Sequence, residues 1–415
     1  MFFKSISSLL MYFANTKEKG VVAYPTSSSD VSTLIKFSQK YGIDVAVRGG
    51  GHSNRPTSST EGGICIDLST LKSVSIDAIT KTVTVQGGAL WSNVYAAIAP
   101  HSLALVGGVI TSVGVGGLSL MGGYGWLTGA HGLTLDNILS VEIVLASGEI
   151  VTASEKENED LFWAVRGAGA CFGVVTSFTL RAHPQENLVW NGNLVLPSTA
   201  LKIAIEVANK VMAKENRGGK ASMGVLWVCP PGAPGPVIVC MVYYNGSEED
   251  GKEFFKPLLD LNPKINTTAM RPWVEVNVEE PTINSSTPLR RASAGGSIIG
   301  PFSLSLFESL WEDYVELLSN VKNAQATTLN LVVHNTGKIL EKGQSETAFP
   351  NRGHQANFMI QPSWTGEEND DICREWCRNM REKVRADREK RVSEDAELDE
   401  NTRVAVGESA HDDGE

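Results

Sequence analysis

Positive charge is scarcer than negative charge in this sequence. Among 415 residues, 36 are Lys or Arg and 47 are Asp or Glu, which gives a formal net charge of −11. Binding to nucleic acid through counterion release needs clustered cations, so this balance argues against a nucleic-acid partner. Long hydrophobic runs are missing as well. No segment reaches the roughly 18 to 20 apolar residues of a membrane span, so we expect no membrane partner.

Cysteine is also scarce. Six cysteines in a chain of this length do not make a disulfide framework. Cys373 and Cys377 lie one helical turn apart, but no second pair of Cys or His residues completes a metal site, so we expect no bound metal. The thiols are better interpreted as buried or incidental.

A clear targeting signal is missing too. Residues 1–20 contain a short apolar run and one early lysine, Lys4, without a strongly basic segment or an A-x-A-like cleavage site. Sequons begin at Asn245, Asn266 and Asn284, which would suit secretion, although such triplets are frequent by chance. A cytoplasmic and a secreted location both stay open, and so does the oligomeric state.

Glycine, in contrast, is abundant, and the segments between its clusters have the patterns of short strands and helices. Residues 21–42 follow a strand, turn and helix pattern, and later segments give strands joined by turns or short helices. This order predicts an α+β fold. For the first helix we expect Ser29 or Asp30 at the N-cap, Gly42 at the end, and an apolar face made of Val31, Leu34, Ile35 and Phe37.

Three regions follow from changes in pattern along the chain. Residues 1–186 are rich in glycine and mix short strands with short helices. Residues 187–366 contain longer strands and amphipathic helices, which predicts an antiparallel sheet with helices on one face. Residues 367–415 are polar and strongly charged, so we expect a helix that passes into a disordered tail.

Two segments, at residues 49–51 and 106–132, are too rich in glycine for long regular elements. Neither has the G-x-G-x-x-G fingerprint of a Rossmann dinucleotide site. The run from Gly114 has Ser119 where the third glycine belongs, and turn residues with another strand follow Gly51. Successive backbone N–H groups can still form an anion nest that a pyrophosphate approaches closely. These residues alone leave two interpretations, tight turns only or a long dinucleotide bound by backbone.

Five motifs occur in order along roughly residues 20–186: VRGGGHS, GGICIDLSTL, VTVQGGALWSNV, VGVGGLSLMGGYGWLTGAHGLTLDNILSVEIVLASG and NEDLFWAVRGAGACFGVVTSFTL. Together they resemble the flavoprotein oxidases of the vanillyl-alcohol oxidase superfamily, in particular the branch of the berberine bridge enzyme and hydroxynicotine oxidase. The resemblance implies FAD as cofactor. It also implies a PCMH-type FAD-binding domain of two α+β subdomains over residues 1–186, followed by a substrate-binding domain.

The resemblance also assigns roles to residues. His52, at the end of R-G-G-G-H, corresponds to the histidine that the family bonds covalently to a methyl carbon of the flavin ring. Some members add a second link from a cysteine three residues before V-G-x-G-G, but Ile110 stands there, so we expect a single link. The other cofactor-binding residues implied are Arg48, Gly49, Gly50, Gly51 and Ser53 at the pyrophosphate, then Gly116, Gly117, Gly122, Gly123, Gly125, Asn137, Gly173 and Val174.

The activity that the resemblance implies is that of an FAD-dependent oxidoreductase. Hydride would pass from a hydroxyl- or amine-bearing small molecule to the tethered flavin, which dioxygen would reoxidise to give hydrogen peroxide. The sequence identifies no catalytic residue. His354, Tyr243 and Glu275 have suitable acid–base chemistry, and Trp227 could line a pocket, but the surface or the core suits each of them better.

The family's C-terminal motifs raise an alternative. A Tyr-x-Asn-like segment and a basic K-x-x-Y-D-P-x-N ending are both missing after residue 366. In the family this part helps to cover the flavin and often supplies active-site groups. The alternative function is therefore a truncated flavin-binding remnant without catalytic activity.

Overall fold

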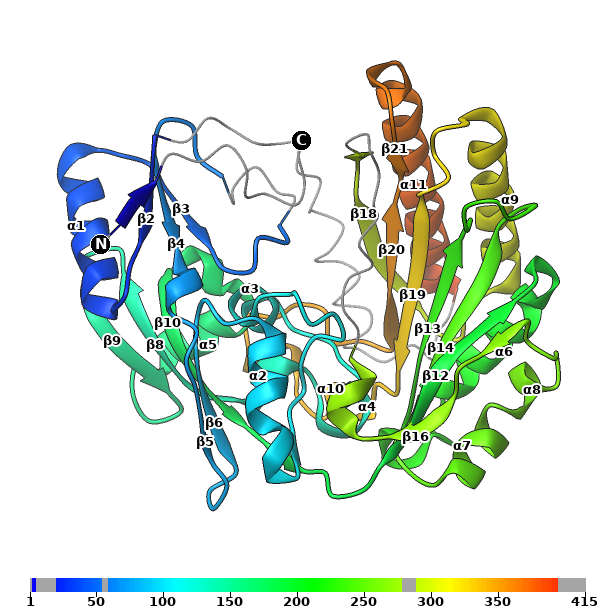
Figure 1. The fold of residues 1–415 in the computed structure, drawn as a ribbon, viewed down its shortest axis with the longest axis horizontal. Coiled ribbons are helices and arrows are strands. Elements are labelled where there is room, and N and C mark those ends of the chain that lie inside the picture. Colours follow the sequence, from blue (N-terminus) through cyan, green and yellow to red (C-terminus); the bar gives the residue numbers. More distant parts are fainter. Residues whose placement is uncertain (1, 5–19, 54–58, 278–288, 395–415) are drawn as a thin grey trace.

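The computed structural model describes residues 2–4, 20–53, 59–277 and 289–394. Figure 1 shows two halves side by side, with the N-terminal half at the left and the C-terminal half at the right. The N-terminal half contains two principal sheets, and the C-terminal half is built on one large antiparallel sheet. The predicted α+β class is confirmed.

The first sheet of the N-terminal half has the strand order β1 (Phe2–Lys4), β2 (Val21–Tyr24), β4 (Ile64–Asp67) and β3 (Val45–Arg48). The last three strands are parallel, and β1 pairs with β2 in the antiparallel sense. Helix α1 (Ser28–Tyr41) packs on this sheet through Val31, Leu34 and Ile35, which share one core with strand residues of β2 and β4.

Helix α1 differs in two details from its sequence prediction. The N-cap is Ser27 and not Ser29 or Asp30, because the Ser27 hydroxyl accepts a hydrogen bond from the Asp30 backbone N–H at 3.1 Å. Phe37 is 48% exposed and lies outside the apolar face. Gly42 ends the helix in the left-handed conformation, with φ of 64°, as predicted.

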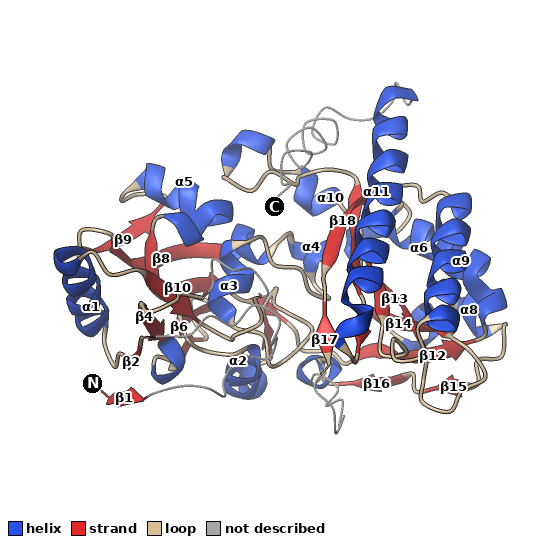
Figure 2. Cartoon of the chain, turned by 90° about the horizontal axis from the view of Figure 1, so that it is seen from above, coloured by secondary structure: helices blue, strands red, loops and turns tan. Residues whose placement is uncertain are grey.

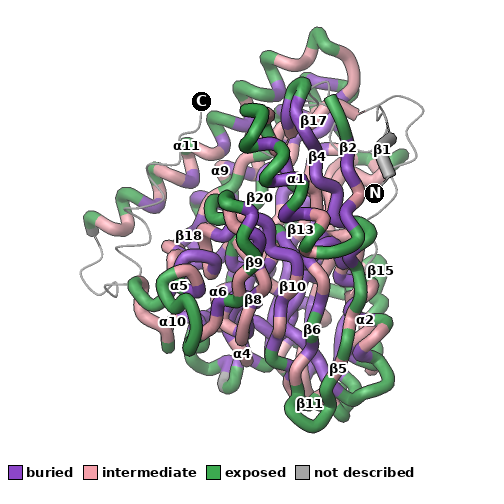
Figure 3. Tube along the Cα trace, turned by 90° about the vertical axis from the view of Figure 1, so that its left-hand side faces the viewer, coloured by how far each residue is buried: buried purple, intermediate pink, exposed green. Residues whose placement is uncertain are grey.

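The second sheet is antiparallel, with the order β5 (Val74–Asp77), β6 (Thr82–Gln86), β10 (Gly173–Arg181), β8 (Ile138–Leu145) and β9 (Ile150–Ser154). Figure 3 shows this sheet, whose central strand β10 is mostly buried. Helices α2 (Trp91–Ile98) and α5 (Glu159–Ala168) contribute to the core on one face. On the other face, Val144 and Val174 join the core beneath α1, so this sheet is covered on both sides.

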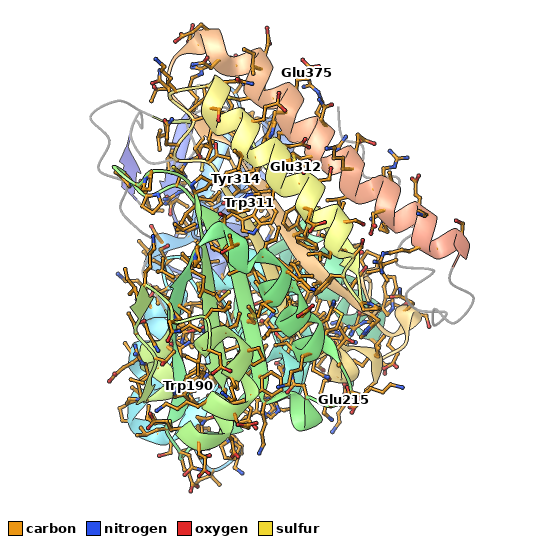
Figure 4. The ribbon with its side chains drawn as sticks, turned by 90° about the vertical axis from the view of Figure 1, so that its right-hand side faces the viewer. Trp190, Glu215, Trp311, Glu312, Tyr314 and Glu375 are labelled. Atoms are coloured by element: carbon orange, nitrogen blue, oxygen red, sulfur yellow. The ribbon has the colours of Figure 1, made fainter. Side chains whose placement is uncertain are left out.

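The large sheet has the order β15 (Ile265–Asn266), β12 (Val189–Leu196), β14 (Val237–Tyr244), β13 (Ala221–Val228), β19 (Thr328–His334), β20 (Gln355–Gln361) and β18 (Ala294–Ile299). Helices α6 (Leu201–Met212), α9 (Leu304–Asn320) and α11 (Asp370–Glu394) cover one face, as Figures 2 and 4 show. The opposite face is turned toward the N-terminal half (Figure 1).

Shorter strands and α-helices connect these elements. They are β7 (Leu103–Ala104), α3 (Val115–Leu120), α4 (Thr128–His131), β11 (His183–Pro184), α7 (Glu248–Phe254), α8 (Lys256–Leu259), β16 (Ala269–Arg271), β17 (Arg290–Arg291), α10 (Gly337–Leu340) and β21 (Ser363–Trp364). No helix within the described residues is long and apolar enough to cross a membrane.

Helix α11 changes the predicted boundary of the second domain. We expected residues 367–415 to form a separate charged tail, but α11 packs against β18, β20 and α9. Its buried apolar residues recur every three or four positions and form one stripe, made of Cys373, Cys377, Met380 and Val384. The high charge of the other faces conceals this stripe, so the domain continues through residue 394. Residues 395–415 lie outside the described part.

Candidate cofactor and substrate site

The two glycine-rich segments meet backbone to backbone. A Cβ atom at Gly50 would lie 2.3 Å from Gly114 N, and a Cβ atom at Gly114 would lie 2.4 Å from Gly50 N, which is too close for any side chain. Gly50 follows β3 and Gly114 precedes α3, so this contact joins the first sheet to the second glycine segment. Glycine is required at both positions because the backbones approach so closely.

Arg48 and Asp67 hold the base of the first glycine loop. They are register partners at the ends of β3 and β4, and Arg48 Nη1 donates to Asp67 Oδ2 at 2.7 Å. Gly51 has φ of 78°, and a Cβ there would lie 3.1 Å from Arg48 Nη2. The guanidinium therefore lies against the loop, with its Nε buried and unpartnered among the described residues. A cation beneath a turn rich in N–H groups suits a bound anion.

His52 lies half-buried after this loop, and its Nε2 is 3.2 Å from Ser112 Oγ. Ser112 comes two residues before Gly114, so the second glycine segment also orients the imidazole. An Nε2–H that donates to Ser112 leaves the lone pair on Nδ1. Ile110 lies in the same turn, where its carbonyl accepts from Val113 N at 3.2 Å. Sequence reasoning missed Ser112, although it belongs to the conspicuous glycine-rich run.

The five glycines of the second segment have different surroundings. A Cβ at Gly117 would have no atom within 4 Å, so this glycine borders open space. The other four are closely packed, because an added Cβ would lie within 2.9 Å of a neighbouring atom. That atom is Gly87 O for Gly116 and Gly107 O for Gly125, and it belongs to the side chain of Phe349 for Gly122 and of Thr134 for Gly123. Most of this segment therefore owes its glycines to packing.

Asn137, Gly173 and Val174 lie within the fold and do not join the His52 loop through their side chains. Asn137 donates to the carbonyls of His131 and Leu133 at 3.0 and 2.8 Å. Val174 is 3% exposed in the core beneath α1, and a Cβ at Gly173 would lie 2.3 Å from Val144 O. From Gly173 and Val174, only backbone atoms are available to a ligand.

A stacked histidine pair lies beside Asn137. The rings of His131 and His183 are 3.6 Å apart and nearly parallel, and His183 Nε2 is 2.8 Å from Asn137 Oδ1. Burial lowers the pKa of both histidines, and that of His183 falls to about 3 with a further contribution from His131. Both rings are therefore neutral near pH 7, which allows their close stacking at the junction between the two halves.

The second glycine segment also contacts the large sheet. Tyr124 stacks near His334 of β19, with ring centroids 6.0 Å apart, and Trp126 stacks on Tyr243 of β14 at 5.3 Å. The Tyr124 hydroxyl is hydrogen-bonded to the Asn357 side chain of β20, and burial raises the pKa of Tyr124 to about 12. The glycine segment thus packs on one end of the sheet face that is opposite the helices.

The four residues considered from sequence for the substrate side do not come together. Tyr243 is fully buried beneath Trp126, and burial raises its pKa well above the usual range. Trp227 points into the helix layer, where it contacts Trp311 and Tyr314, both labelled in Figure 4. Glu275 is exposed in a short turn, and His354 Nδ1 is 2.8 Å from Thr336 Oγ1.

His334 is the buried histidine that sequence reasoning missed. The Ser222 hydroxyl donates to the Trp126 carbonyl at 3.0 Å, so its oxygen accepts from His334 Nδ1 at 3.1 Å. This arrangement holds His334 as the Nδ1–H tautomer. Burial lowers the pKa of His334 to about 4, and Nε2 has no hydrogen-bond partner among the described residues. An isolated His at a strand end gave no signal in the sequence.

A buried ion pair closes the junction beside this site. Arg352, with no exposed side-chain surface, donates to Asp136 Oδ1 at 2.7 Å and to Thr347 Oγ1 at 2.9 Å. Asp136 belongs to the N-terminal half, whereas Arg352 lies just before β20. The ion pair therefore links the turn that contains Asp136, just after the second glycine segment, to the domain of the large sheet.

The comparisons with known proteins agree with this geometry. Residues 20–154 match the family model described as an FAD binding domain. FAD-linked oxidoreductase pgmH of Aspergillus terreus is 39% identical over 266 residues, which cover 61% of this chain and 54% of that protein. An FAD-linked oxidoreductase of Dictyostelium discoideum is 26% identical over 370 residues, 88% of this chain and 77% of that protein. The chain thus matches about half the length of pgmH.

Solved structures share the fold of both halves. The 6-hydroxy-D-nicotine oxidase of Arthrobacter nicotinovorans aligns with a TM-score of 0.76 and 22% identity over 90% of this chain and 82% of that chain. BBE-like 1 of Physcomitrella patens aligns with a TM-score of 0.79 and 22% identity, over 91% of this chain and 83% of that chain. The xylooligosaccharide oxidase of Myceliophthora thermophila aligns with a TM-score of 0.70 and 23% identity, over 86% of this chain and 79% of that chain. These similarities define the fold as PCMH-type.

The residues of the site fit FAD. The glycine loop at residues 49–51 offers backbone donors above the Arg48 guanidinium, and Gly117 borders space that no side chain fills. His52 adds a half-buried imidazole at the edge of that loop. Within the described residues, no cluster of three His, Cys, Asp or Glu side chains could hold a metal ion.

Proposed function

We propose that the chain, whose residues 20–154 match an FAD binding domain, is an FAD-linked oxidoreductase of the vanillyl-alcohol oxidase superfamily whose flavin is attached through His52 alone. The observation that carries this proposal is the backbone contact between Gly50 and Gly114 beside His52 and Ser112. It supports a single site in which both glycine segments contact one extended cofactor. Ile110 offers no thiol for a second link.

When bound, FAD would accept a hydride equivalent from a substrate C–H bond and pass the electrons to dioxygen, with hydrogen peroxide as product. The chain's residues hold and orient the reactants. Backbone N–H groups of residues 49–51 would bind the pyrophosphate, and Ser112 would orient the His52 imidazole through Nε2. The substrate would bind on the face of the large sheet opposite its helices, near Tyr124 and Asn357.

The substrate in this proposal is a small molecule that bears a hydroxyl or amine group. Among the structural neighbours, one is named as a hydroxynicotine oxidase and another as a xylooligosaccharide oxidase. Amine and alcohol oxidation both need a proton acceptor beside the reacting carbon. Dioxygen as the electron acceptor is part of the proposal, and peroxide release is its direct consequence.

The covalent link is tested by acid precipitation of the purified protein. A yellow pellet is expected, because the flavin stays attached when the fold is lost. His52→Ala should give a colourless pellet, with any flavin in the supernatant, while circular dichroism shows an intact fold. Colour that leaves the wild-type pellet would contradict the His52 link, and protein purified without any flavin would contradict the cofactor itself.

Catalysis is tested separately by peroxide release against a panel of alcohols, amines and sugars. At least one member should yield peroxide above the rate of buffer alone, with reduction of the flavin absorbance when oxygen is excluded. Flavin reduction without peroxide would favour a dehydrogenase. A stably flavinylated protein that no panel member reduces would favour the flavin-binding remnant.

A further inference from the structure

The three Asn-x-Ser/Thr sequons, at Asn245, Asn266 and Asn284, have different surroundings in the fold. Asn284 lies outside the described residues. A sequon can carry an N-linked glycan in the folded protein only where the Asn amide nitrogen is accessible and a bulky glycan has room at the surface. The contacts of Asn245 and Asn266 therefore decide which of these two can be a glycan acceptor.

The Asn245 sequon is occupied by hydrogen bonds of the fold. Asn245 is half-buried, its Nδ2 donates to Gln185 Oε1, and its Oδ1 accepts from Gln185 Nε2, both at 3.1 Å. Such a reciprocal pair uses the amide hydrogen on the same side as Oδ1. A glycan linked through a trans amide takes the position of that hydrogen, so it would break the pair. The third sequon residue, Ser247, is also engaged, as the N-cap of α7.

Asn266 lies instead on the outermost strand of the large sheet. Among the described strands, β15 and β16 pair only with β12, and Figure 2 shows both at the outer edge of this domain. Asn266 is exposed, and so are its neighbours Ile265 and Thr267. No described strand lies beyond this edge, so a glycan on Asn266 would extend into solvent.

The Thr268 backbone and side chain hold the Asn266 amide by its oxygen. Thr268 Oγ1 donates to Asn266 Oδ1 at 2.7 Å, and Thr268 N donates to the same oxygen at 2.9 Å. Within the described residues, no hydrogen bond engages Asn266 Nδ2. The atom that a glycan needs is therefore free, and the hydroxyl of the third sequon residue lies beside it.

We propose that Asn266 is an N-glycan acceptor, and that Asn245 is not, in chains that enter a secretory pathway. Asn266 Nδ2 loses a proton and bonds to the anomeric carbon of an oligosaccharide carried by a polyprenyl pyrophosphate. The bond from that carbon to the pyrophosphate oxygen breaks, and the lipid pyrophosphate leaves with the electron pair. The host's oligosaccharyltransferase catalyses this transfer, which is independent of the proposed flavin chemistry.

The proposal is tested on the full chain, secreted by a eukaryotic host from a cleavable signal placed before residue 1. Peptide N-glycosidase F releases the glycan and converts its Asn to Asp, so peptide mass spectrometry locates the acceptor. We expect conversion at Asn266 in most secreted chains and little at Asn245, because the cell retains and degrades chains that fold poorly. No conversion at Asn266, or equal conversion at Asn245, would overturn the proposal.

Neighbouring threonines provide a matched pair of variants. Thr268→Ala removes the sequon hydroxyl and should abolish conversion at Asn266. Thr267→Ala is the control, because it leaves the sequon intact, although it too removes an edge-strand hydroxyl, which accepts from Asn193 N at 2.9 Å. Equal conversion in the two variants would contradict the assignment.

Asn266→Gln separates the glycan from the fold. It should lose the same glycan mass as Thr268→Ala and keep the flavin content of wild type, since Asn266 lies on the outer edge of the C-terminal half. Asn245→Gln should keep the glycan mass of wild type. Wild-type glycan mass in Asn266→Gln would show that another residue is the acceptor.

Discussion

His52 and Ser112 show how much a single contact adds to a motif. The R-G-G-G-H motif implies, by resemblance, that His52 would carry the flavin, but it does not say what orients the ring. The 3.2 Å contact between His52 Nε2 and Ser112 Oγ supplies that answer from a segment about 60 residues later in the chain. When the Nε2–H donates to Ser112, the other ring nitrogen keeps the lone pair that a nucleophile needs.

Ser112→Ala is expected to reduce covalent flavinylation without loss of the fold. Without the hydroxyl, the imidazole samples other orientations and tautomers, so the flavin should be incorporated several-fold more slowly. The fraction of flavin retained in the acid pellet, followed over time after FAD is added to the apoprotein, measures this rate. Ser112→Thr keeps a hydroxyl and should recover part of the rate. Equal rates for Ser112→Ala and wild type would remove Ser112 from the mechanism.

His334 predicts a pH dependence of stability. Burial lowers its folded-state pKa to about 4, below the ordinary value of 6.5, so between these values only the unfolded chain is protonated at this residue. The free energy of unfolding should therefore fall as pH decreases from about 6.5 toward 4. The contribution of one such group is about 1.4 kcal/mol per pH unit. His183, with a folded pKa of about 3, acts in the same direction.

Urea titrations at pH 5 and pH 7 measure this dependence. His334→Gln removes the titrating group and should reduce the difference in the free energy of unfolding between the two conditions by about 2 kcal/mol. His101→Gln is the control, because His101 is exposed at a short 3-10 turn. A pH dependence in His334→Gln that equals that of wild type would show that His334 is not buried neutral.

At the scale of elements, the loop between α10 and β20 connects the large-sheet domain to helix α5 of the N-terminal half. The loop between α10 and β20 packs on the N-terminal half, where Trp163 Nε1 donates to Ser345 O at 2.7 Å and Ala348 N donates to Trp163 O at 3.2 Å. A Cβ at Gly167 would lie 2.3 Å from Phe349 N. The C-terminal half therefore contacts α5, which packs beside the second glycine segment.

Gly114→Ala tests the contact between the two glycine segments. The new Cβ would lie 2.4 Å from Gly50 N, so one loop must move. We expect flavin content to fall several-fold and the free energy of unfolding to fall by about 1–3 kcal/mol. Flavin absorbance per protein and urea unfolding measure the two effects. Gly235→Ala, where a Cβ would meet no atom within 4 Å, should leave both unchanged. An unaltered flavin content in Gly114→Ala would show that the loops need not touch to bind FAD.

At the scale of the whole molecule, the buried Arg352–Asp136 pair joins the two halves. Asp136→Ala should lower the free energy of unfolding by about 3–5 kcal/mol, because it leaves the Arg352 charge buried without its partner. Urea unfolding, followed by tryptophan fluorescence, measures the loss. The double variant Asp136→Leu/Arg352→Met should lose less than the single one. Asp260→Ala, which breaks the exposed pair with Lys256, is the control and should change little. A small loss in Asp136→Ala would show that water reaches Arg352.

The sequence by itself determined the α+β class, the glycine segments and the identity of the implied flavin-linking histidine. Those features depend on local chemistry: glycine density, strand and helix periodicity, and ordered motifs that resemble one superfamily. It also predicted the helices on one face of the large sheet. Sequence did not show that the charged α11 packs on this sheet, because a narrow apolar stripe is hard to see among many charges.

Only the tertiary structure decided which distant residues share the site. Ser112 reaches His52, Tyr124 reaches Asn357, and Arg48 meets Asp67 because loop contacts and strand register bring them together. Burial likewise separated Trp227 and Tyr243 from solvent, although their residue types suited a pocket. Register and burial depend on contacts between segments far apart in the chain, so local sequence patterns cannot specify them.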